Sequence, residues 1–323
     1  MDESTIRDGT TVQALINKIA ATDEARLMVE LLNEFNAIVA KTPGFDNFRM
    51  NMEKNRYNGN IFLYDHTRVV LRNYPGGDYI HASYVATNQQ TRRFVLTQAP
   101  LPETINDFWH MVAQEEAQVI VAICQFDESS SPAKTEDPFP IYWPRAAGQV
   151  ETYGAVEVKR TGGSQQPGIT TTKLKWKQDQ GPERSLTHLH LHAEGWEPKG
   201  LPTAKLLRLM DAVWDAESEM MKANGHLSHP PPMIVHCGSG TTRSGQFTAL
   251  AIAIEAIKRG WQWSVKEIII SLQNQRFGVL REPCQAMALV YSIVSYAKSS
   301  GNLENPPENL PKVLSLIRKE LGG

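Results

Sequence analysis

Residues 233–244 read MIVHCGSGTTRS, an apolar segment that runs into a glycine-rich loop. The first four residues are typical of a buried strand, and an apolar helical pattern begins at Phe247. The loop from Cys237 to Ser244 is therefore predicted to connect a strand to a helix. Backbone N–H groups of such a loop can converge on one point, where the helix N-terminus adds positive potential. The stretch thus predicts a binding site for a doubly charged phosphate.

The residue types in this loop also predict a nucleophile. Gly238 and Gly240 allow the backbone to approach a ligand closely. The same positive potential should lower the pKa of Cys237 and supply a thiolate, while Arg243 offers a planar fork to two phosphate oxygens. A lone cysteine at a strand end is usually a core residue. Here Cys237 and Arg243 are separated by five residues and followed by the hydroxyl of Ser244, a spacing that favours the functional interpretation.

The composition is that of an ordinary globular protein. Of the 323 residues, 41% are hydrophobic and 21% are charged, enough to bury a full core in one large domain or two small ones. The formal net charge of -2 gives no uniform positive field, so binding to nucleic acid is not expected. Any anion site must therefore be local.

The cysteines indicate the cellular compartment. Cys124, Cys237 and Cys284 are an odd number without the spacing of a disulfide framework. We therefore expect a reducing, cytoplasmic environment, in which a free thiolate persists. The sequence has neither a signal-peptide pattern nor an apolar run long enough to predict a membrane span.

The pattern along the chain predicts one α/β domain over residues 1–323, with a central twisted mixed sheet flanked by helices. Residues 10–40 contain two amphipathic helical patterns and are expected to form an N-terminal cap. Short β-branched and aromatic runs predict strands, which include 94–97, 119–124 and 156–158.

The rest of the chain is predicted to consist of helices and exposed loops. Ser264 and Glu267 have the spacing of a capping box at the start of one of these helices. Helices are predicted near 204–222, 243–258, 265–274 and 284–297, and hairpin loops at 127–138 and 162–168.

Several motifs resemble those of receptor and non-receptor protein tyrosine phosphatases, and they occur in the order of that family. The loop His236 to Ser244 is similar to the family's signature loop. The likeness covers about residues 30–298, and the other matching stretches are Lys54–Tyr57 (phosphotyrosine-recognition loop), Asp78–Tyr84 (DYINASY), Thr97–Thr104 with Phe108–Trp109 (TQGPLxxT…FW) and Tyr142–Pro144.

The resemblance implies a role for each of these residues. Cys237 would attack phosphorus, Arg243 and the loop amides would bind phosphate and stabilise the transition state, and Ser244 would assist the thiolate. Tyr57 would stack on the substrate ring and select phosphotyrosine. The expected phosphate- and substrate-binding residues are Gly238, Ser239, Gly240, Thr241, Thr242, Arg243, Tyr57 and Gln285. No cofactor is implied.

The sequence departs from the family pattern at the loop that carries the general acid. Active members read W-P-D-x-G-x-P, whereas residues 196–202 read WEPKGLP, so Pro198 occupies the acid position. Loss of general acid catalysis costs roughly 10² to 10⁴-fold in rate. Glu197 could substitute as the acid if the backbone shifts, and Glu194 is a more remote candidate. Alternatively, both are solvated loop charges.

Three further departures from the family pattern also indicate weakened hydrolysis. Arg281 replaces the first glutamine of the family's Q-x-x-x-Q segment, which positions the hydrolytic water, while Gln285 matches the second. Gln114, with Glu115 as an alternative register, stands where a glutamate pairs with the signature arginine in active relatives. Thr242 replaces a glycine before that arginine and restricts the backbone.

These departures lead to three hypotheses. The first is a pseudophosphatase that captures a tyrosine-phosphorylated protein, such as a kinase, with weak or lost hydrolysis. The second is an active phosphatase that forms a cysteinyl-phosphate on Cys237, with Glu197 as acid. The third is a scaffold that never binds phosphate.

The strand around residues 188–192 is rich in histidine. His188, His190 and His192 alternate along it, a spacing that can bring imidazoles to zinc. Because no Cys, Asp or Glu ligand completes the set, packing is the favoured interpretation and no metal is expected.

Overall fold

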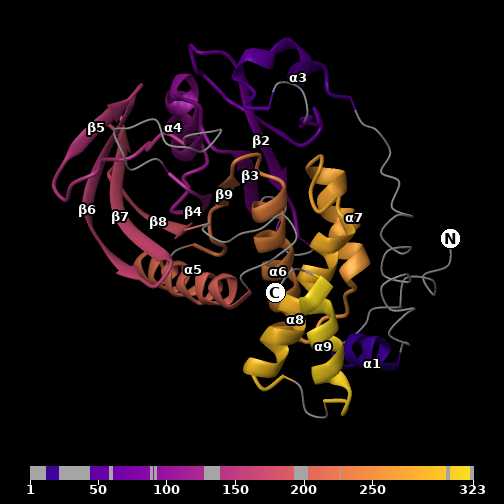
Figure 1. The fold of residues 1–323 in the computed structure, drawn as a ribbon. Helices are drawn as coiled ribbons and strands as arrows, with labels where there is room; N and C mark the ends of the chain where they lie inside the picture. The colour runs from indigo at the N-terminus through magenta and orange to yellow at the C-terminus, as the bar shows by residue number, and fades with distance from the viewer. Residues whose placement is uncertain are drawn as a thin grey trace.

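A computed structural model of the chain describes residues 12–21, 44–57, 61–87, 90, 93–126, 139–192, 203–225, 227–302 and 306–320. These residues form one nine-stranded mixed sheet with helices on both faces (Figure 1). The predicted α/β class with a mixed sheet is confirmed. Within the described residues, no helix is both long and apolar enough to cross a bilayer.

The strand order places the strand before Cys237 at the centre of the sheet. The order is β1-β2-β3-β9-β4-β8-β7-β6-β5, and β9 pairs in parallel with both β3 and β4. In that order the strands are β1 Arg68–Val70, β2 Tyr79–Val85, β3 Phe94–Gln98, β9 Met233–Cys237, β4 Val119–Cys124, β8 Arg184–His192, β7 Ile169–Gln178, β6 Val156–Gln166 and β5 Val150–Tyr153.

The central strands are apolar throughout because both faces of the sheet are covered. Every residue of β9 and β4 is buried, as expected for parallel strands between two layers. Val235 belongs to the core on one face and Ile234 to the core on the other. This alternation follows from the period of two in a strand.

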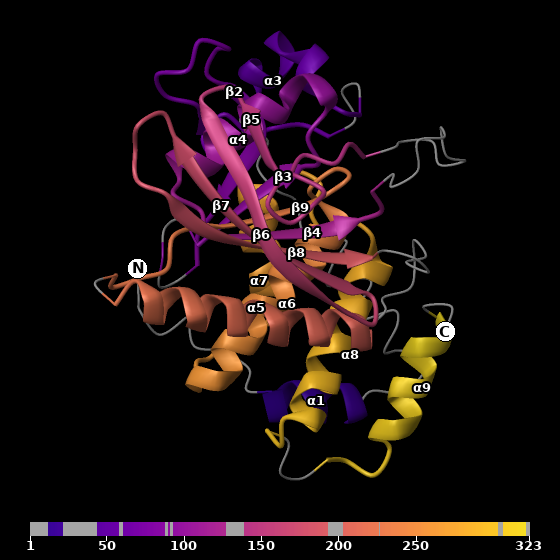
Figure 2. The same cartoon turned by 90° about the vertical axis from the view of Figure 1, so that its left-hand side faces the viewer.

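Helices divide unequally between the two faces. The larger layer holds α5 Thr203–Ala223, α6 Thr242–Arg259, α7 Val265–Gln275 and α8 Pro283–Ser299, with α1 Val12–Ala21 and α9 Leu310–Glu320 packed outside. Helix α4 (Ile105–Gln114) packs on the other face; Figure 2 shows α5 and α4 on opposite sides of the strands. Short helices occur at α3 Asp46–Met50, η2 Met52–Lys54 and η3 Pro102–Thr104.

Most of the predicted elements are confirmed. The predicted strands correspond to β3, β4 and β6, and the four predicted helices correspond to α5, α6, α7 and α8. Ser264 caps α7 by accepting a hydrogen bond from the Glu267 N–H at 3.1 Å. Helix α1 matches the first predicted N-terminal helix, whereas the second lies outside the described residues, as does the predicted loop 127–138.

One prediction about a boundary was wrong. The segment 162–168 is a loop only at its tip, because β6 continues to Gln166 and pairs with β7 in an exposed hairpin arm. Because no helical layer covers this part of the hairpin, its strands do not alternate between apolar and polar residues, and the sequence therefore lacks the usual strand pattern. Helix α6 begins at Thr242, one residue before the predicted start at 243, so that Arg243 and Ser244 lie in its first turn. Helices α4 and α9 were not predicted.

Candidate active site

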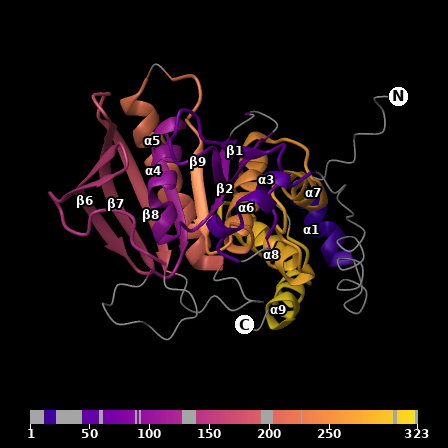
Figure 3. The same ribbon diagram turned by 90° about the horizontal axis from the view of Figure 1, so that it is seen from above.

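The predicted anion loop lies between the end of β9 and the start of α6, near the middle of the molecule (Figure 3). The segment after β3 holds its first residues, because the Ala99 N–H donates to the carbonyls of Cys237 at 2.8 Å and Gly238 at 3.1 Å. Cys237 is 1% exposed. The family motif that begins at Thr97 therefore supports the backbone of the signature loop.

Both glycines of the loop are required by close contacts. Gly240 has φ +71°, and a Cβ at this position would overlap the backbone carbonyl of Thr97. A Cβ on Gly238 would overlap the hydroxyl of Tyr57 and lie 3.2 Å from the Phe139 ring. The Gly240 N–H donates to Cys237 Sγ at 3.3 Å. The loop is thus closed around the thiol.

The electrostatics of the loop favour a thiolate. Burial by itself raises the pKa of Cys237, but the charge of Arg243, the polar groups of Ser244 and the Gly240 N–H together lower it below its usual value. The Ser244 hydroxyl is fully buried. The lowered pKa of Cys237 agrees with the direction that the sequence predicted.

Arg243 is half-buried and is held at the adjacent strand. Its Nη1 donates to the carbonyl of Ile123 at 3.2 Å, near the end of β4. This contact uses one of five N–H donors. The remaining donors of a guanidinium at this position can serve an anion.

Gln114 and Glu115, the two registers predicted for the residue that pairs with the signature arginine in active relatives, bind other partners. Gln114 accepts from the Arg72 N–H at 2.7 Å, and Glu115 accepts from the Tyr84 hydroxyl at 2.7 Å. Both lie at the end of α4, where they bind β1 and β2. The prediction that Gln114 replaces the glutamate of active relatives stays a prediction.

A buried arginine that the sequence analysis missed supports the loop from below. Arg276 is fully buried and donates to the carbonyls of Ser239 at 3.0 Å and Gly240 at 3.3 Å, and to His81 Nδ1 at 2.9 Å. Burial lowers the pKa of Arg276 to about 10, so it stays charged at neutral pH. These hydrogen bonds orient the carbonyls of Ser239 and Gly240 towards Arg276 and away from the side of the loop that is predicted to bind the anion.

His81 stands where the family's DYINASY stretch has asparagine. Burial and the charge of Arg276 lower the pKa of His81 to about 3, so the imidazole is neutral. Its Nε2 lies 3.0 Å from the Ile61 carbonyl and Nδ1 accepts from Arg276, which assigns the proton to Nε2. The unusual histidine was a visible signal, but nothing in the sequence linked it to Arg276.

The recognition loop is fixed beside the signature loop. The Gln98 amide spans it, accepting from the Arg56 N–H at 3.0 Å and donating to the Lys54 carbonyl at 2.8 Å. Arg56 donates to the Pro100 carbonyl at 2.8 Å. Tyr57 is half-buried with its hydroxyl next to Gly238, so the structure brings it to the predicted edge of the site.

In the segment that resembles the family's Q-x-x-x-Q, Arg281 replaces the first glutamine, and the second, Gln285, is engaged in a helix cap. The Gln285 side chain accepts from the Glu282 N–H at 3.3 Å and forms part of the capping box of α8. Arg281 is exposed, and its guanidinium lies 5.4 Å from the centroid of the Phe277 ring. Neither side chain is therefore directed at Cys237 by these contacts.

The histidines of β8 are engaged in packing and hydrogen bonds. The Tyr142 hydroxyl bridges Nε2 of His188 at 2.8 Å and Nε2 of His236 at 2.6 Å. His190 Nε2 lies 2.7 Å from the Cys124 carbonyl. Burial lowers the pKa of His236 to about 3. In the part of the chain that is described, no cluster of His, Cys, Asp and Glu suits a metal ion.

The structure does not describe the loop predicted to carry the general acid. Glu197, Pro198 and Glu194 lie outside the described residues. Their predicted roles stay predictions.

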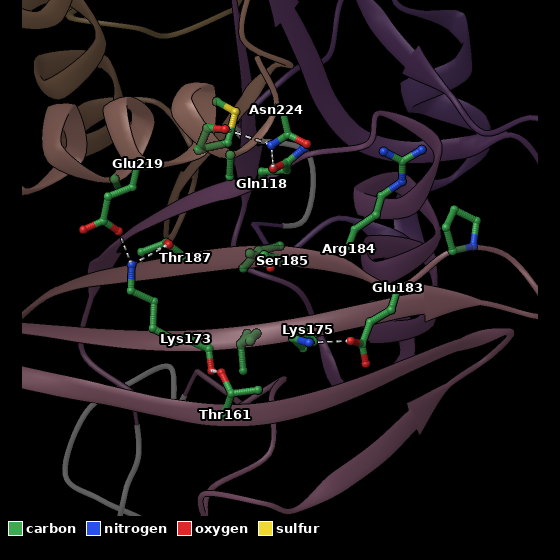
Figure 4. Close-up of a pocket in the computed structure, with 16 residues that line it drawn as sticks. Gln118, Thr161, Lys173, Lys175, Glu183, Arg184, Ser185, Thr187, Glu219 and Asn224 are labelled. Carbon is green, nitrogen blue, oxygen red and sulfur yellow. Dashed lines mark hydrogen bonds and ion pairs between the residues drawn. The ribbon is translucent and has the colours of Figure 1, made fainter. Parts of the chain in front are cut away.

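A groove of about 660 Å³ lies between β6–β8 and α5, and its lysines make it a second candidate for an anion site. Figure 4 shows two of its cations paired within it: Lys173 with Glu219 at 2.8 Å, and Lys175 with Glu183 at 2.6 Å. Carboxylates already neutralise these lysines. The groove is therefore a poorer anion site than the loop at Cys237, despite its volume.

Comparisons with known proteins agree with the motifs. Residues 51–295 match the family described as Protein-tyrosine phosphatase. Tyrosine-protein phosphatase Lar-like of Caenorhabditis elegans is 31% identical over 83% of this chain and 12% of its own length. Receptor-type tyrosine-protein phosphatase F of Danio rerio is 29% identical over 82% of this chain and 13% of its own length. Tyrosine-protein phosphatase non-receptor type 7 of Homo sapiens is 30% identical over 72% and 59%, respectively. The chain thus spans a small part of the first two relatives.

Proposed function

The chain belongs to the protein-tyrosine phosphatase family, and we propose that it captures phosphotyrosine on a partner protein while hydrolysing it slowly or not at all. One contrast carries the proposal. The Cys237 loop is closed, braced and electropositive, whereas Gln285 caps a helix and Arg281 occupies the position of the other water-positioning glutamine.

In the proposed complex, backbone N–H groups of the loop and Arg243 bind the phosphate. The N-terminus of α6 adds positive potential, because the loop residues at Thr242 and Arg243 begin this helix. Tyr57 flanks the tyrosyl ring, and its place beside Gly238 sets the depth of the slot. Because a phosphoserine is shorter, its phosphate would reach the loop only with loss of the ring contact.

The chemistry would stall after binding for two reasons. Attack of the Cys237 thiolate on phosphorus breaks the bond to the tyrosyl oxygen, which then needs a proton. Pro198 at the acid position cannot supply it. Hydrolysis of the resulting cysteinyl phosphate needs an oriented water, and with Arg281 in the first position and Gln285 engaged at α8, that water lacks its usual partners.

The second hypothesis, an active phosphatase with Glu197 as the acid, is favoured by one observation. The lowered pKa of Cys237 supplies the nucleophile for the first chemical step. A lowered pKa serves binding poorly, since a thiolate repels a phosphate dianion. Turnover that depends on both Cys237 and Glu197 would support this alternative.

We propose that the partner is a tyrosine-phosphorylated protein, such as a kinase, encountered in the cytoplasm. The captured phosphate would be protected from other phosphatases. A partner of this kind would be held through Arg243, so the third hypothesis, a scaffold that never binds phosphate, predicts capture that is insensitive to this residue.

The decisive experiment measures hydrolysis and binding side by side. We would assay a generic aryl phosphate and a phosphotyrosine peptide with wild type, Cys237→Ser, Glu197→Gln and Arg243→Ala. Peptide binding without Cys237-dependent turnover, lost in Arg243→Ala, is the expected result. Turnover near that of ordinary members would overturn the proposal, and its loss in Glu197→Gln would establish the active alternative.

A further inference from the structure

The hydroxyl groups of Ser239 and Thr241 are paired within the anion loop. Ser239 Oγ and Thr241 Oγ1 lie 2.7 Å apart, so one hydroxyl donates a hydrogen bond to the other. Ser239 is half-buried, whereas Thr241 is only 2% exposed. A hydroxyl that is buried to this degree needs a partner in the protein, and Ser239 supplies it. The pair joins the two residues on either side of Gly240.

Thr241 is also the residue at which α6 would be capped. It occupies the N-cap position, where a threonine hydroxyl commonly accepts from the N–H of the second or third helical residue. In α6 these two residues are Arg243 and Ser244. Thr241 makes no side-chain cap in the described structure, and its backbone has φ -126° and ψ -58°. The hydroxyl expected to cap the helix is therefore used within the loop.

Helix α7 shows the other arrangement in the same protein. Its N-cap residue, Ser264, accepts from the Glu267 N–H at 3.1 Å, and its backbone is extended, with φ -133° and ψ 152°. The two N-cap residues thus differ mainly in ψ and in the partner of the hydroxyl. Thr241 would need a similar extended backbone to cap α6, and its hydrogen bond to Ser239 opposes that change.

An uncapped first turn leaves N–H groups for a ligand. The first N–H groups of a helix have no partner within the helix and attract anions. The first turn of α6 contains no acidic residue that could compete with a phosphate. The backbone N–H of Ser244 is among the groups that lower the pKa of Cys237. The N–H groups that a capping threonine would occupy are therefore those next to the thiol.

The backbone of the loop is held independently of the two hydroxyls. Arg276 donates to the carbonyls of Ser239 and Gly240, and Gly240 lies against the backbone of Thr97. Removal of the Ser239 hydroxyl should therefore leave the loop closed and affect mainly Thr241. Because a buried hydroxyl without a partner is costly, we expect that of Thr241 to turn to the N–H groups of its own helix.

We propose that Ser239 is a positioning residue for phosphate: its hydroxyl holds that of Thr241 and so keeps the first-turn N–H groups of α6 free for the anion. The inference rests on the proposed function and deepens it, because it concerns how the same loop binds phosphotyrosine. Ser239 acts through Thr241. The N-cap hydroxyl thus serves the ligand site and not the stability of the helix.

The test compares Ser239→Ala with a double variant. In Cys237→Ser protein, which forms no cysteinyl phosphate, we would measure affinities for inorganic phosphate and for a phosphotyrosine peptide. Ser239→Ala should weaken both by about tenfold, because one charge-assisted hydrogen bond is lost. The urea midpoint should not fall, because the helix gains a cap. Adding Thr241→Val should restore most of the affinity, since valine cannot cap α6.

Further measurements separate positioning from a purely structural role. In Ser239→Ala protein, amide hydrogen exchange should slow at Arg243 or Ser244, and the alkylation midpoint of Cys237 should move to higher pH. Ser239→Thr retains a hydroxyl and should keep most of the affinity. Ser264→Ala removes the cap of α7 and serves as the matched control: it should lower the urea midpoint and leave phosphate affinity unchanged.

The outcomes distinguish failure of the positioning role from failure of the proposed function. Unchanged affinity in Ser239→Ala, or no recovery of affinity when Thr241→Val is added, would overturn the positioning role alone. Absence of binding of either ligand to Cys237→Ser protein with Ser239 intact would overturn the proposed function as well.

Discussion

The turns that lead into α6 and α8 share an architecture but differ in what their side chains are free to do. Each contains a glycine with positive φ, Gly240 or Gly278, and each precedes a helix N-terminus. In the first turn, backbone groups surround a thiol whose pKa is lowered. In the second, Gln285 is used to cap the helix.

This difference separates two requirements of the same reaction. Phosphate binding depends mainly on backbone N–H groups, which survive side-chain substitution as long as the loop stays closed. Orientation of a hydrolytic water depends on particular side chains, which a single substitution removes. A member of this family can therefore lose turnover and retain capture.

The strongest test of this difference between binding and turnover is to restore the side chains that the family pattern has at the acid and water-positioning sites. Combining Glu197→Pro, Pro198→Asp and Arg281→Gln rebuilds the W-P-D acid and the first water-positioning glutamine. We expect kcat for an aryl phosphate to rise by about 10² to 10⁴-fold, because the sequence lacks the family's acid and its first water-positioning glutamine. Steady-state and single-turnover kinetics measure the rise.

The partial variants serve as controls for this repair. The acid substitutions alone should speed release of the phenol and leave a phosphorylated Cys237 detectable by mass spectrometry. Arg281→Gln alone should change little. An unchanged kcat in the triple variant would mean that the block lies elsewhere, with Thr242 as the next candidate.

Substitution of two glycines tests whether the close packing of the anion loop against Thr97 is required. Gly240→Ala and Gly260→Ala both impose a methyl group at positive φ, but only the first meets backbone atoms, whereas Gly260 has nothing within 4 Å. Gly260→Ala should cost about 1 kcal/mol of unfolding free energy. Gly240→Ala should cost about 2 to 3 kcal/mol more and weaken phosphopeptide binding.

Urea unfolding and peptide titration of both variants measure these effects. Equal stabilities would show that the loop yields easily. In that case the contact between Gly240 and Thr97 would not define the phosphate site.

The smallest expected effect concerns the pH dependence of the thiol. Because the folded pKa of Cys237 is lowered, its alkylation rate should reach a plateau at lower pH than that of an ordinary thiol. Ser244→Ala removes a group that stabilises the thiolate, so the midpoint should move to higher pH. Arg243→Gln removes the larger contribution and should move it further in the same direction.

Site-resolved mass spectrometry is needed here, because Cys284 is partly accessible. A midpoint for Cys237 at or above the ordinary thiol value would contradict the lowered pKa. It would also remove the argument for a nucleophile in the resting loop.

Local pattern was enough to predict the strand, loop and helix around Cys237. A parallel central strand is apolar throughout, and the hydrophobic pattern of the sequence changes to a helical period where the next helix begins. Both features can be seen within a few residues of Cys237. The apolar pattern of α6 begins only at Phe247, after a polar first turn that includes Thr242 and Arg243.

Local pattern could not predict residues whose role depends on distant partners. The partner of Gln114, the backbone N–H of Arg72, is 42 residues away along the chain and follows the end of β1. Arg276 was missed because a surface and a fully buried arginine look alike in sequence. Its contacts with Ser239 and His81 join segments that meet only when the sheet forms.

The sequence by itself determined the family and the fold class, and it predicted the residues of the anion loop, since these depend on short motifs with local geometry. Only the tertiary structure decided what those motifs can still do. It engaged Gln285 at the start of α8, placed Arg281 over Phe277, and set Arg276 beneath the loop. The physical reason is that burial, pKa and hydrogen-bond partners are properties of neighbours in space, and most of these neighbours are far apart along the chain.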